Sequence, residues 1–352
     1  MKKVLLVSNR VFHYRTRIYN AFYEKWKAMG WEFHVVSNEY QEVDCGYDFI
    51  KHELPFGSHR YARFIKELKP DVVINFLHLK DRMIIPLTIC CHRLGIPMIY
   101  WNHGVNLQDP DNKWKNAIFH FIHTISDAII LYTPDQLKFI SRKNLPKTFI
   151  AYNTLNFETS DAFRKKMRSK EQIKAQYGIK EQRVLLYISR IVPHKGLDIL
   201  LSNFQDTKDI ALVIVGGGLS EQQRAIIDSH ANYYYLGEKY GDEVDEIYSI
   251  GDLFSTPGHI GLALNQAMYW GLPVLVLNRK HAPEIYYMQD GVNGFVLEDE
   301  QALKAKVLEL CHDDALLQRL SAAARHTYET RMALDNMFDG FEQAVNYVQK
   351  QG

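Results

Sequence analysis

Two cations five residues apart are the strongest chemical signal in the sequence. Arg190 follows a short apolar run, and Lys195 stands directly before Gly196 and an apolar stretch that predicts a helix over 197–201. A guanidinium fork and an ammonium group that converge on one point suit a pyrophosphate. Either cation alone is typical of an exposed surface side chain. The pair beside a helix opened by glycine therefore predicts phosphate binding.

A glycine-rich turn further along the chain gives a second signal. Residues 255–278, STPGHIGLALNQAMYWGLPVLVLN, predict a strand end, a turn with Gly258 and Gly261, a helix over 262–270 and another strand. The two glycines would let the backbone come close to a ligand, and the helix would point its N-terminal N–H groups at the turn, which favours an anion. Gly271 would end this helix. The same pattern is also typical of a βαβ corner without a ligand.

Short apolar runs alternate with amphipathic helical patterns along the whole chain. This predicts an α/β protein with parallel sheets covered by helices on both faces. A chain of 352 residues is long for one domain, and the runs form two series, so we expect two doubly wound, Rossmann-like domains. The strands are expected at 4–8, 33–37, 71–76, 97–101, 128–132 and 148–152, and then at 184–189, 211–215, 233–236, 252–255, 273–277 and 294–297.

Composition restricts the class of protein. The 42 Lys and Arg against 41 Asp and Glu give no general reason to expect a nucleic-acid partner. No apolar run approaches the length of a membrane span and no signal peptide is recognised, so we expect a cytoplasmic protein. The four cysteines lack metal-ligand spacing. Asp109-Pro110-Asp111 is a D-x-D in a polar loop and is not interpreted as a metal site.

Two basic segments leave a contact with a membrane surface open. Residues 164–183 carry eight Lys and Arg against two Glu, and residues 113–123, KWKNAIFHFIH, mix basic and apolar side chains as interfacial helices do. For the first segment we favour a solvated helix of the second domain. For the other we favour a helix packed within the first domain.

Ligands of open α/β sheets bind beyond the carboxyl ends of the strands, so polar residues after the expected strands are the site candidates. The candidates of the two domains would face each other across a cleft. In the first half they are Asn9, His13, Tyr14, Arg15, Asn102, His103 and Asn153. In the second half they are Arg190, Lys195, Gly217, Gly258, His259, Ile260, Gly261, Leu262, Gln266 and Glu284. For two of these residues a structural role is an equal alternative to ligand binding. Gly217 would then belong to a plain tight turn, and Glu284 would be a carboxylate at the start of a helix.

The same segments resemble family 4 glycosyltransferases, the glycosyl transferases group 1. YISRIVPHKGLDILL at 187–201 is similar to the donor-phosphate segment of that family, and DLFSTPGHIGLALNQAMYWGLPVLV at 252–276 to its donor-sugar loop and helix. APEIYYMQDGVNGFV at 282–296 is similar to the segment that follows. HYRTRIYN, YWNHG and AYNTLNF in the first half resemble segments of the capsule and O-antigen transferases of the family.

The resemblance implies a GT-B fold, with Rossmann-like domains at 1–158 and 159–333 that face a cleft and a last helix within 334–352 that crosses back to the first. It implies a retaining, hexosyltransferase-like enzyme that needs no metal or cofactor and moves a sugar from a nucleotide-sugar to a glycan or lipid-linked acceptor. Such an enzyme would serve bacterial capsule or lipopolysaccharide synthesis, with peripheral contact at the inner membrane face. The alternatives are a GT-B epimerase of nucleotide-sugars and an inactive donor-binding scaffold subunit.

The resemblance also implies roles for residues. Arg190 and Lys195 would hold the donor diphosphate, and His103 would lie close to the transferred sugar. The donor loop of the family has two glutamates eight positions apart, which align here with Gly258 and Gln266. Gln266 would still accept a hydrogen bond from the ribose, and His259 or main-chain N–H groups would fill part of the gap at Gly258. A subgroup with a P-G-x-x-G-L loop resembles this chain more closely, and the identity of the donor stays open.

Overall fold

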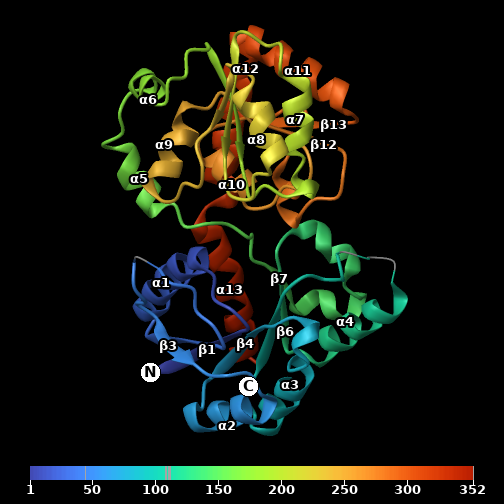
Figure 1. The fold of residues 1–352 in the computed structure, drawn as a ribbon. Helices are drawn as coiled ribbons and strands as arrows, with labels where there is room; N and C mark the ends of the chain where they lie inside the picture. Colours follow the sequence, from blue (N-terminus) through green and yellow to red (C-terminus); the bar gives the residue numbers. More distant parts are fainter. Residues whose placement is uncertain (44, 108, 110–111, 352) are drawn as a thin grey trace. The chain divides into compact units, whose positions relative to one another are not determined.

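The structure, a computed structural model, describes residues 1–43, 45–107, 109 and 112–351 and divides the chain into two compact units (Figure 1). Unit 1 contains Met1–Asn156 together with the chain from Leu334 onward, and unit 2 is Phe157–Ala333. Each unit is a parallel sheet with helices on both faces, as expected for a doubly wound α/β domain. In the structure the first unit ends at Asn156, whereas the sequence predicts that it ends at residue 158.

Unit 1 is built on a seven-stranded sheet of order β3-β2-β1-β4-β5-β6-β7, in which all neighbours are parallel. The strand order reverses between β1 and β4, which is where such sheets bind ligands. The strands are β1 (Lys2–Ser8), β2 (Trp31–Ser37), β3 (Ile50–Glu53), β4 (Val72–Phe76), β5 (Met98–Trp101), β6 (Ala128–Leu131) and β7 (Thr148–Ile150). The helices are α1 (His13–Ala28), α2 (Ser58–Leu68), α3 (Ile84–Arg93), α4 (Lys113–Ile125) and α13 (Leu334–Gln349), with short turns η1 (Leu79–Asp81), η2 (Pro134–Phe139) and η3 (Arg142–Lys147).

Successive side chains of these strands enter two different cores. Val4 and Leu6 of β1 pack in a core with α1 and α13, whereas Leu5 and Val7 pack in a second core with α2 and α3. Because a strand points alternate side chains to opposite faces, and both faces are covered, the sequence shows near-continuous apolar runs.

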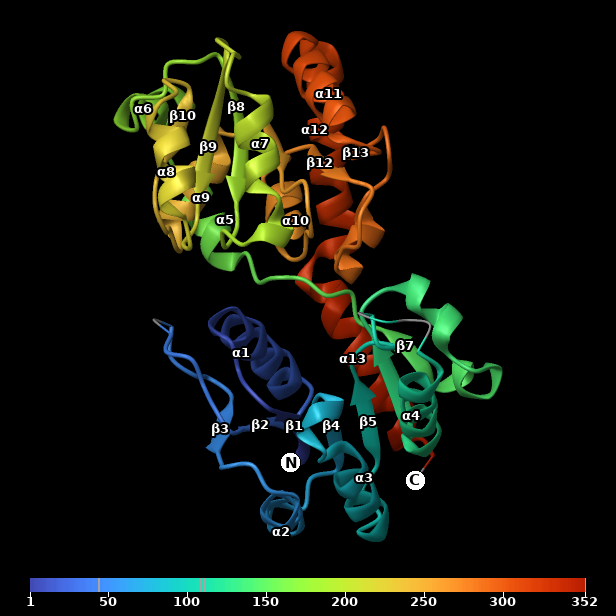
Figure 2. The same cartoon turned by 45° about the vertical axis from the view of Figure 1, so that its right-hand side comes forward.

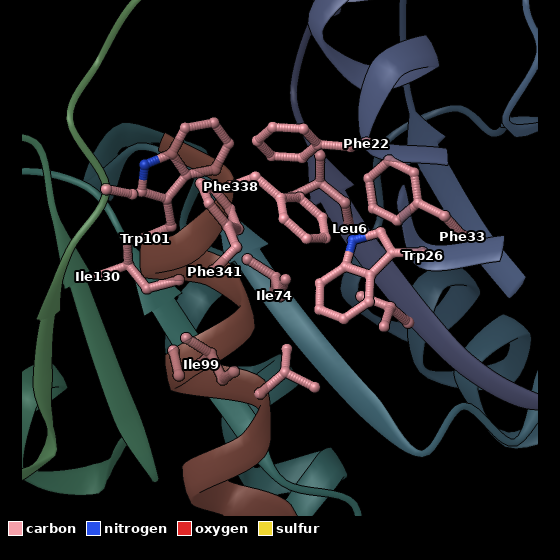
Figure 3. Close-up of a cluster of buried hydrophobic side chains, with 14 of the residues drawn as sticks. Leu6, Phe22, Trp26, Phe33, Ile74, Ile99, Trp101, Ile130, Phe338 and Phe341 are labelled. Atoms are coloured by element: carbon pink, nitrogen blue, oxygen red, sulfur yellow. The ribbon is translucent and has the colours of Figure 1, made fainter. Parts of the chain in front are cut away.

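The last helix of the chain completes the first of these cores (Figure 3). The rings of Phe338 and Phe341 in α13 lie 5.2 and 5.0 Å from the ring of Phe22 in α1. Gly340 allows close packing, because a Cβ there would lie 2.2 Å from the carbonyl oxygen of Ile150. The predicted return of the C-terminal helix to the first domain is therefore confirmed.

Unit 2 is built on a six-stranded parallel sheet of order β10-β9-β8-β11-β12-β13, and its order reverses between β8 and β11 (Figure 2). Helices α7, α8 and α11 pack on one of its faces. The strands are β8 (Arg183–Ile188), β9 (Ile210–Val215), β10 (Tyr233–Tyr235), β11 (Leu253–Ser255), β12 (Val274–Leu277) and β13 (Gly294–Leu297). The helices are α5 (Glu158–Arg164), α6 (Lys170–Gln176), α7 (Leu197–Asn203), α8 (Glu221–Asp228), α9 (Asp242–Ile250), α10 (Ala263–Tyr269), α11 (Glu300–His312) and α12 (Asp314–Thr327), with short turns η4 (Pro193–Lys195), η5 (Pro283–Tyr287) and η6 (Tyr328–Met332).

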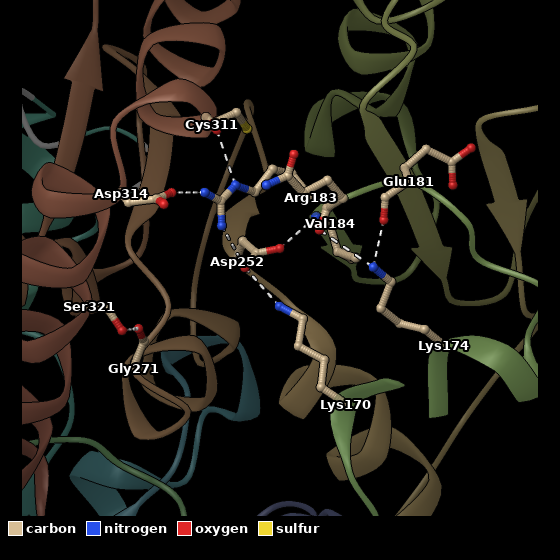
Figure 4. Close-up of polar contacts among 11 residues, drawn as sticks. Lys170, Lys174, Glu181, Arg183, Val184, Asp252, Gly271, Cys311, Asp314 and Ser321 are labelled. Carbon is tan, nitrogen blue, oxygen red and sulfur yellow. Dashed lines mark hydrogen bonds and ion pairs between the residues drawn. The ribbon is translucent and has the colours of Figure 1, made fainter. Parts of the chain in front are cut away.

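The basic segment 164–183 is paired with acidic groups of its own unit (Figure 4). The ammonium group of Lys170 lies 2.7 Å from the carboxylate of Asp252, and the guanidinium of Arg183 pairs with Asp314. These pairs favour the interpretation of this segment as part of the surface of unit 2 rather than as a membrane patch.

His123 determines in part how unit 1 responds to acid. Its side chain lies on the inner face of α4, fully buried, and neither ring nitrogen has a hydrogen-bond partner among the described residues. Burial lowers its pKa from 6.5 to about 3, and the neighbouring His120 and Lys147 add to this lowering. Below pH 6.5 the unfolded chain takes up a proton that the folded chain does not accept, so the folded state loses stability as the pH falls from 6.5 towards 3.

We expect His123→Leu to reduce this sensitivity to acid. Between about pH 7.5 and about pH 5 the wild-type protein should lose about 2 kcal/mol of unfolding free energy that the variant retains. Urea unfolding at the two pH values measures the difference, with a leucine at the exposed His59 as control. An equal pH dependence of His123→Leu and wild type would contradict a buried neutral imidazole.

Candidate functional site

The strongest candidates of unit 2 lie where its strand order reverses. The loop after β8 contains Lys195, and the loop after the neighbouring β11 contains the turn Thr256–Leu262. The N–H of Gly258 donates to the carbonyl of Lys195 at 3.1 Å, and the N–H of His259 donates to the carbonyl of His194 at 2.8 Å. These two bonds bring the two main chemical signals of the sequence together.

The ammonium group of Lys195 is held at this turn. Its Nζ donates to the carbonyl of His259 at 2.7 Å. Burial lowers the pKa of Lys195, the guanidinium of Arg190 lowers it further, and the carboxylate of Glu284 acts in the opposite direction. Arg190, Lys195 and Glu284 therefore share one electrostatic environment. Two cations whose charges repel each other lie after β8, beside the point where the strand order reverses, and such a pair suits an anionic ligand.

The glycines at this point serve packing of one backbone segment against another. A Cβ on Gly258 would lie 2.1 Å from the carbonyl oxygen of His194. A Cβ on Gly196, which has φ +81°, would lie 2.9 Å from the nitrogen of Gly258. Gly261 differs, because a Cβ there would meet its nearest neighbour, the Cβ of Ala282, at an ordinary 3.6 Å. The close approach expected at Gly258 is therefore an approach to the Lys195 segment.

Helix α10 differs from the expected anion-binding helix. It has seven residues, and the N–H groups of residues 264–266 donate to the carbonyls of residues 261 and 262. The turn itself thus uses N–H groups that the sequence interpretation assigns to an anion. The helix ends at Tyr269 with Trp270 as its C-cap, and the next residue, Gly271, has the positive φ of +71° expected of a glycine that follows a helix.

Gln266 is held by an acidic residue that the sequence analysis missed. The amide nitrogen of Gln266 donates to Oδ1 of Asp245 at 3.3 Å, and the indole nitrogen of Trp270 donates to the same oxygen at 3.2 Å. Asp245 is buried; burial raises its pKa, while hydrogen bonds from Ser160, Trp270 and Gln266 act in the opposite direction. With its nitrogen engaged, Gln266 offers its carbonyl oxygen to a ligand.

The remaining side chains of the turn fasten it to the segment that leads to Glu284. Ile260 is fully buried, its N–H donates to Nδ1 of His281 at 3.2 Å, and its carbonyl accepts from the N–H of Ala282 at 3.0 Å. Nδ1 of His259 donates to the carbonyl of Lys280 at 3.0 Å. The backbone N–H and carbonyl of Ile260 are thus both engaged within the protein, and Leu262 is half-buried.

Gly217 belongs to the glycine run 216–218 after β9, which packs against the loops that follow β8 and β10. A Cβ on Gly217 would lie 1.7 Å from Oε1 of Glu238, and a Cβ on Gly216 would lie 1.9 Å from the carbonyl oxygen of Ser189. Of the two expectations for this run, the structure supports tight packing. Glu238, just after β10, was missed, although the rule of polar residues after strands could have found it.

The candidates of unit 1 lie beyond its strands β1, β5 and β7. Asn9 donates to the carboxylate of Asp81 at 3.3 Å, which joins the loops after β1 and β4 where the strand order reverses. Asn102 is buried; its amide donates to the carbonyl of Leu77 at 3.0 Å and accepts from the N–H of His103 at 2.9 Å. Asn102 therefore positions the backbone that carries His103.

The imidazole ring of His103 is neutral near pH 7 and can form hydrogen bonds. Burial lowers its pKa to about 4, His78 adds to the lowering, and a hydrogen bond with Gln136 opposes it. The ring lies 4.6 Å from that of Tyr132, and Nδ1 is buried without a hydrogen-bond partner among the described residues. A neutral imidazole of this kind suits a hydroxyl group. His78, after β4, was missed because no residue after that strand was considered.

The other unit 1 candidates have different surroundings. The guanidinium of Arg15 is buried and lies 5.1 Å from the ring centroid of Trp101 and 5.4 Å from that of Tyr14, so it is part of an aromatic cluster. His13 is exposed and its N–H donates to the side chain of Gln41 at 3.1 Å. Asn153 is buried in the segment after β7.

A metal site was not expected from the sequence. Within the described residues, no group of three or more His, Cys, Asp or Glu side chains is placed to hold a metal ion. Pro110 and Asp111 of the D-x-D lie outside the described residues.

Known proteins resemble this chain in both sequence and fold. Residues 169–327 match the model of the family described as Glycosyl transferases group 1. Sulfoquinovosyl transferase SQD2 of Arabidopsis thaliana is 27% identical over 177 residues, 48% of this chain and 35% of that protein. A GDP-mannose-dependent alpha-(1-6)-phosphatidylinositol monomannoside mannosyltransferase of Mycolicibacterium smegmatis is 27% identical over 197 residues, 50% of each chain. The matched part thus spans half or less of these relatives.

The solved structures define the fold. Anabaena HepE in complex with UDP superposes with a TM-score of 0.74 at 13% identity, over 98% of this chain and 100% of that one. The chain therefore has the GT-B fold, as predicted. The family match covers Arg190, Lys195, the turn and Gln266, so these candidates lie within the segment that resembles group 1 glycosyltransferases.

Proposed function

We propose that the chain is a retaining, metal-independent glycosyltransferase that moves a sugar from a nucleotide-sugar to a glycan or lipid-linked acceptor. The observation that carries this proposal is the junction of Arg190 and Lys195 with the turn Thr256–Leu262, at the reversal of the strand order in unit 2. The similarity to a mannosyltransferase whose name states GDP-mannose dependence, and to a structure that holds UDP, supports a nucleotide-sugar donor.

In the proposed reaction the two cations act on the leaving group. Arg190 and Lys195 bind the donor diphosphate and stabilise the negative charge that grows on it as the bond to the sugar breaks. The bond from Lys195 to the carbonyl of His259 holds the ammonium group in place beforehand. The carbonyl oxygen of Gln266 accepts a hydrogen bond from a ribose hydroxyl, and the neutral ring of His103 hydrogen-bonds a sugar hydroxyl.

Carboxylates from other segments compensate for the two that the donor loop lacks. Glu284 is buried in the electrostatic environment of Lys195, on the segment tied to Ile260. Asp245 binds the amide of Gln266. We infer that Glu284 contributes to sugar binding and that Asp245 orients Gln266. The loop then belongs to the P-G-x-x-G-L subgroup similar to capsule and O-antigen transferases, which supports a role in bacterial surface polysaccharide synthesis at the cytoplasmic membrane face.

A screen for nucleotide binding and transfer tests this function. UDP, GDP, dTDP and their sugars are added to the full chain, and the bound nucleotide should raise the unfolding midpoint by mass action. Incubation of that donor with acceptor glycans, in the presence of a chelator, should release the nucleoside diphosphate and retain the anomeric configuration. Stabilisation by none of the nucleotides would overturn the proposal. An isomerised donor without acceptor would indicate an epimerase, and binding without turnover a scaffold subunit.

Asp245→Asn tests the orientation of Gln266. The substitution keeps the shape of the side chain but removes its negative charge, so the hydrogen bonds that Oδ1 accepts from Gln266 and Trp270 become weaker neutral ones. A weakening of about 1 kcal/mol in total should lower nucleotide affinity roughly fivefold with little effect on the transfer rate at saturating donor. Isothermal titration with the nucleotide found above measures this, with Asp242→Asn, exposed at the start of the same helix, as control.

A further inference from the structure

Helix α4 has two apolar faces, and one of them is packed within unit 1. Phe119 and Ile122 are buried in the core that also contains Tyr100 and Leu131. His123 lies on the same inner face. This face accounts for the helix packing that the sequence favours.

A second, adjoining face of α4 presents large apolar side chains to solvent. Trp114 is 87% exposed, Ile118 45% and Phe121 50%. Their spacing of four and three residues, at about 100° per residue, places them within about 60° of one another around the helix axis. Single exposed apolar residues are common, but a stripe of large ones along a helix indicates a contact surface.

Positive charge lies on both sides of this stripe. Lys113 and Lys115 adjoin Trp114 and are therefore about 100° to either side of it. Residues 112–126 contain no Asp or Glu. Asp109, just before the helix, accepts a hydrogen bond from Asn112 at 2.9 Å, close to the N-terminus where an acid is favoured.

A second segment extends the basic surface at the other end of the helix. The ammonium of Lys147 in η3 donates to the carbonyl of Thr124 at 3.2 Å and also contacts that of Ser126. This bond places η3 beside the C-terminal end of α4. η3 also carries the exposed residues Arg142, Lys143 and Leu145. Asp127, after the helix, is engaged by the N–H of Met98 at 2.7 Å.

We propose that the stripe Trp114–Ile118–Phe121, with its flanking cations, docks unit 1 on the surface of an anionic lipid bilayer. A helix that exposes an apolar stripe between lysines matches the interfacial helices that lie in the membrane plane, with the lysine stems extending to the headgroups. At 13 residues α4 is about 20 Å long. No helix among the described residues is long and apolar enough to cross a membrane. The purpose of docking, access to a lipid-linked acceptor, rests on the proposed function.

Vesicle sedimentation of the full chain tests the docking without donor or acceptor. The wild-type protein should bind phosphatidylglycerol-containing vesicles at low salt and bind pure phosphatidylcholine vesicles much less. Trp114→Ser combined with Phe121→Ser should reduce binding at least about tenfold, since each side chain loses an apolar contact. Lys113→Gln combined with Lys115→Gln should reduce it roughly thirtyfold and weaken its salt dependence. The matched control is Phe56→Ser with Ile89→Ser, two exposed apolar residues elsewhere on unit 1.

Tryptophan fluorescence gives a second measurement. Of the other four tryptophans, Trp26, Trp31 and Trp101 are buried, and Trp270 is half-buried in unit 2 with its indole nitrogen bonded to Asp245. A blue shift on vesicle addition should therefore come from Trp114 and vanish in Trp114→Phe while binding persists. Vesicle binding that survives Trp114→Ser/Phe121→Ser, or wild-type protein that self-associates through this stripe and ignores vesicles, would overturn the proposal. Nucleotide stabilisation should be the same in all these variants, so a failed donor screen and a failed vesicle assay are separate results.

Discussion

Lys195→Ala is expected to reduce sugar transfer by roughly 10² to 10³-fold at saturating donor, the usual cost of removing one fixed group that stabilises charge in a transition state. The ammonium group is half-buried, held by the carbonyl of His259 and close to Arg190. No solvent cation can replace it in the same geometry. Steady-state kinetics with the donor identified by the nucleotide screen measures the loss.

Two control variants separate the charge of Lys195 from its structural contact. Lys195→Arg keeps a cation and should retain more activity than alanine. Lys208→Ala removes an exposed ammonium group that lies just before β9. It is at the amino ends of the strands, away from the carboxyl ends where Lys195 lies, and its loss should leave transfer unchanged. Full activity of Lys195→Ala would overturn the assignment of Lys195 to the diphosphate.

The protonation of Lys195 adds a dependence on pH. In the free enzyme, burial and the charge of Arg190 lower the pKa of Lys195, and a bound diphosphate would raise this pKa again. Donor binding then takes up a proton once the pH exceeds the lowered pKa, so affinity should fall as the pH rises through that value and stay level below it. Lys195→Arg should lose this dependence, because a guanidinium stays charged.

The strands could be predicted because helices cover both faces of each sheet. Runs such as 184–188 are apolar throughout, and only their ends shifted by a residue or two. β3 was missed because it is an edge strand, paired only with β2, and its four residues IKHE are partly exposed. A short strand with one covered face does not produce an apolar run.

The site could be predicted as a set of loops but not as a set of contacts. Arg190, Lys195 and the glycine-rich turn follow from their positions after strands. The pairing of Gly258 with Lys195 spans 63 positions of sequence and arises from the neighbouring places of β8 and β11 in the sheet. Asp245 lies on the acidic first turn of α9, where its carboxylate looks solvated; its burial results from the packing of Trp270.

Gly258→Ala is the second change with a large expected effect. Three hydrogen bonds fasten residues 194–195 to residues 258–259, and a Cβ at 258 would lie 2.1 Å from a backbone oxygen. Gly258 lacks a positive φ, so the obstacle is space rather than backbone conformation. The loops must separate, which costs the three bonds, about 3 kcal/mol in all. Nucleotide stabilisation should disappear, and the unfolding midpoint should fall by roughly 6 to 12 °C.

Restoring the acidic residue of the family at this position should fail for the same reason. Gly258→Glu carries the same Cβ as alanine and should lose nucleotide binding as well, whereas Gly261→Ala, which has ordinary space, should bind normally. Gly294→Ala separates crowding from function: its Cβ would lie 2.2 Å from the carbonyl of Val274, at the amino ends of β12 and β13. It should destabilise unit 2 yet keep nucleotide affinity. Higher transfer by Gly258→Glu would instead show that the loop tolerates the carboxylate, and that Glu284 and Asp245 do not compensate for it.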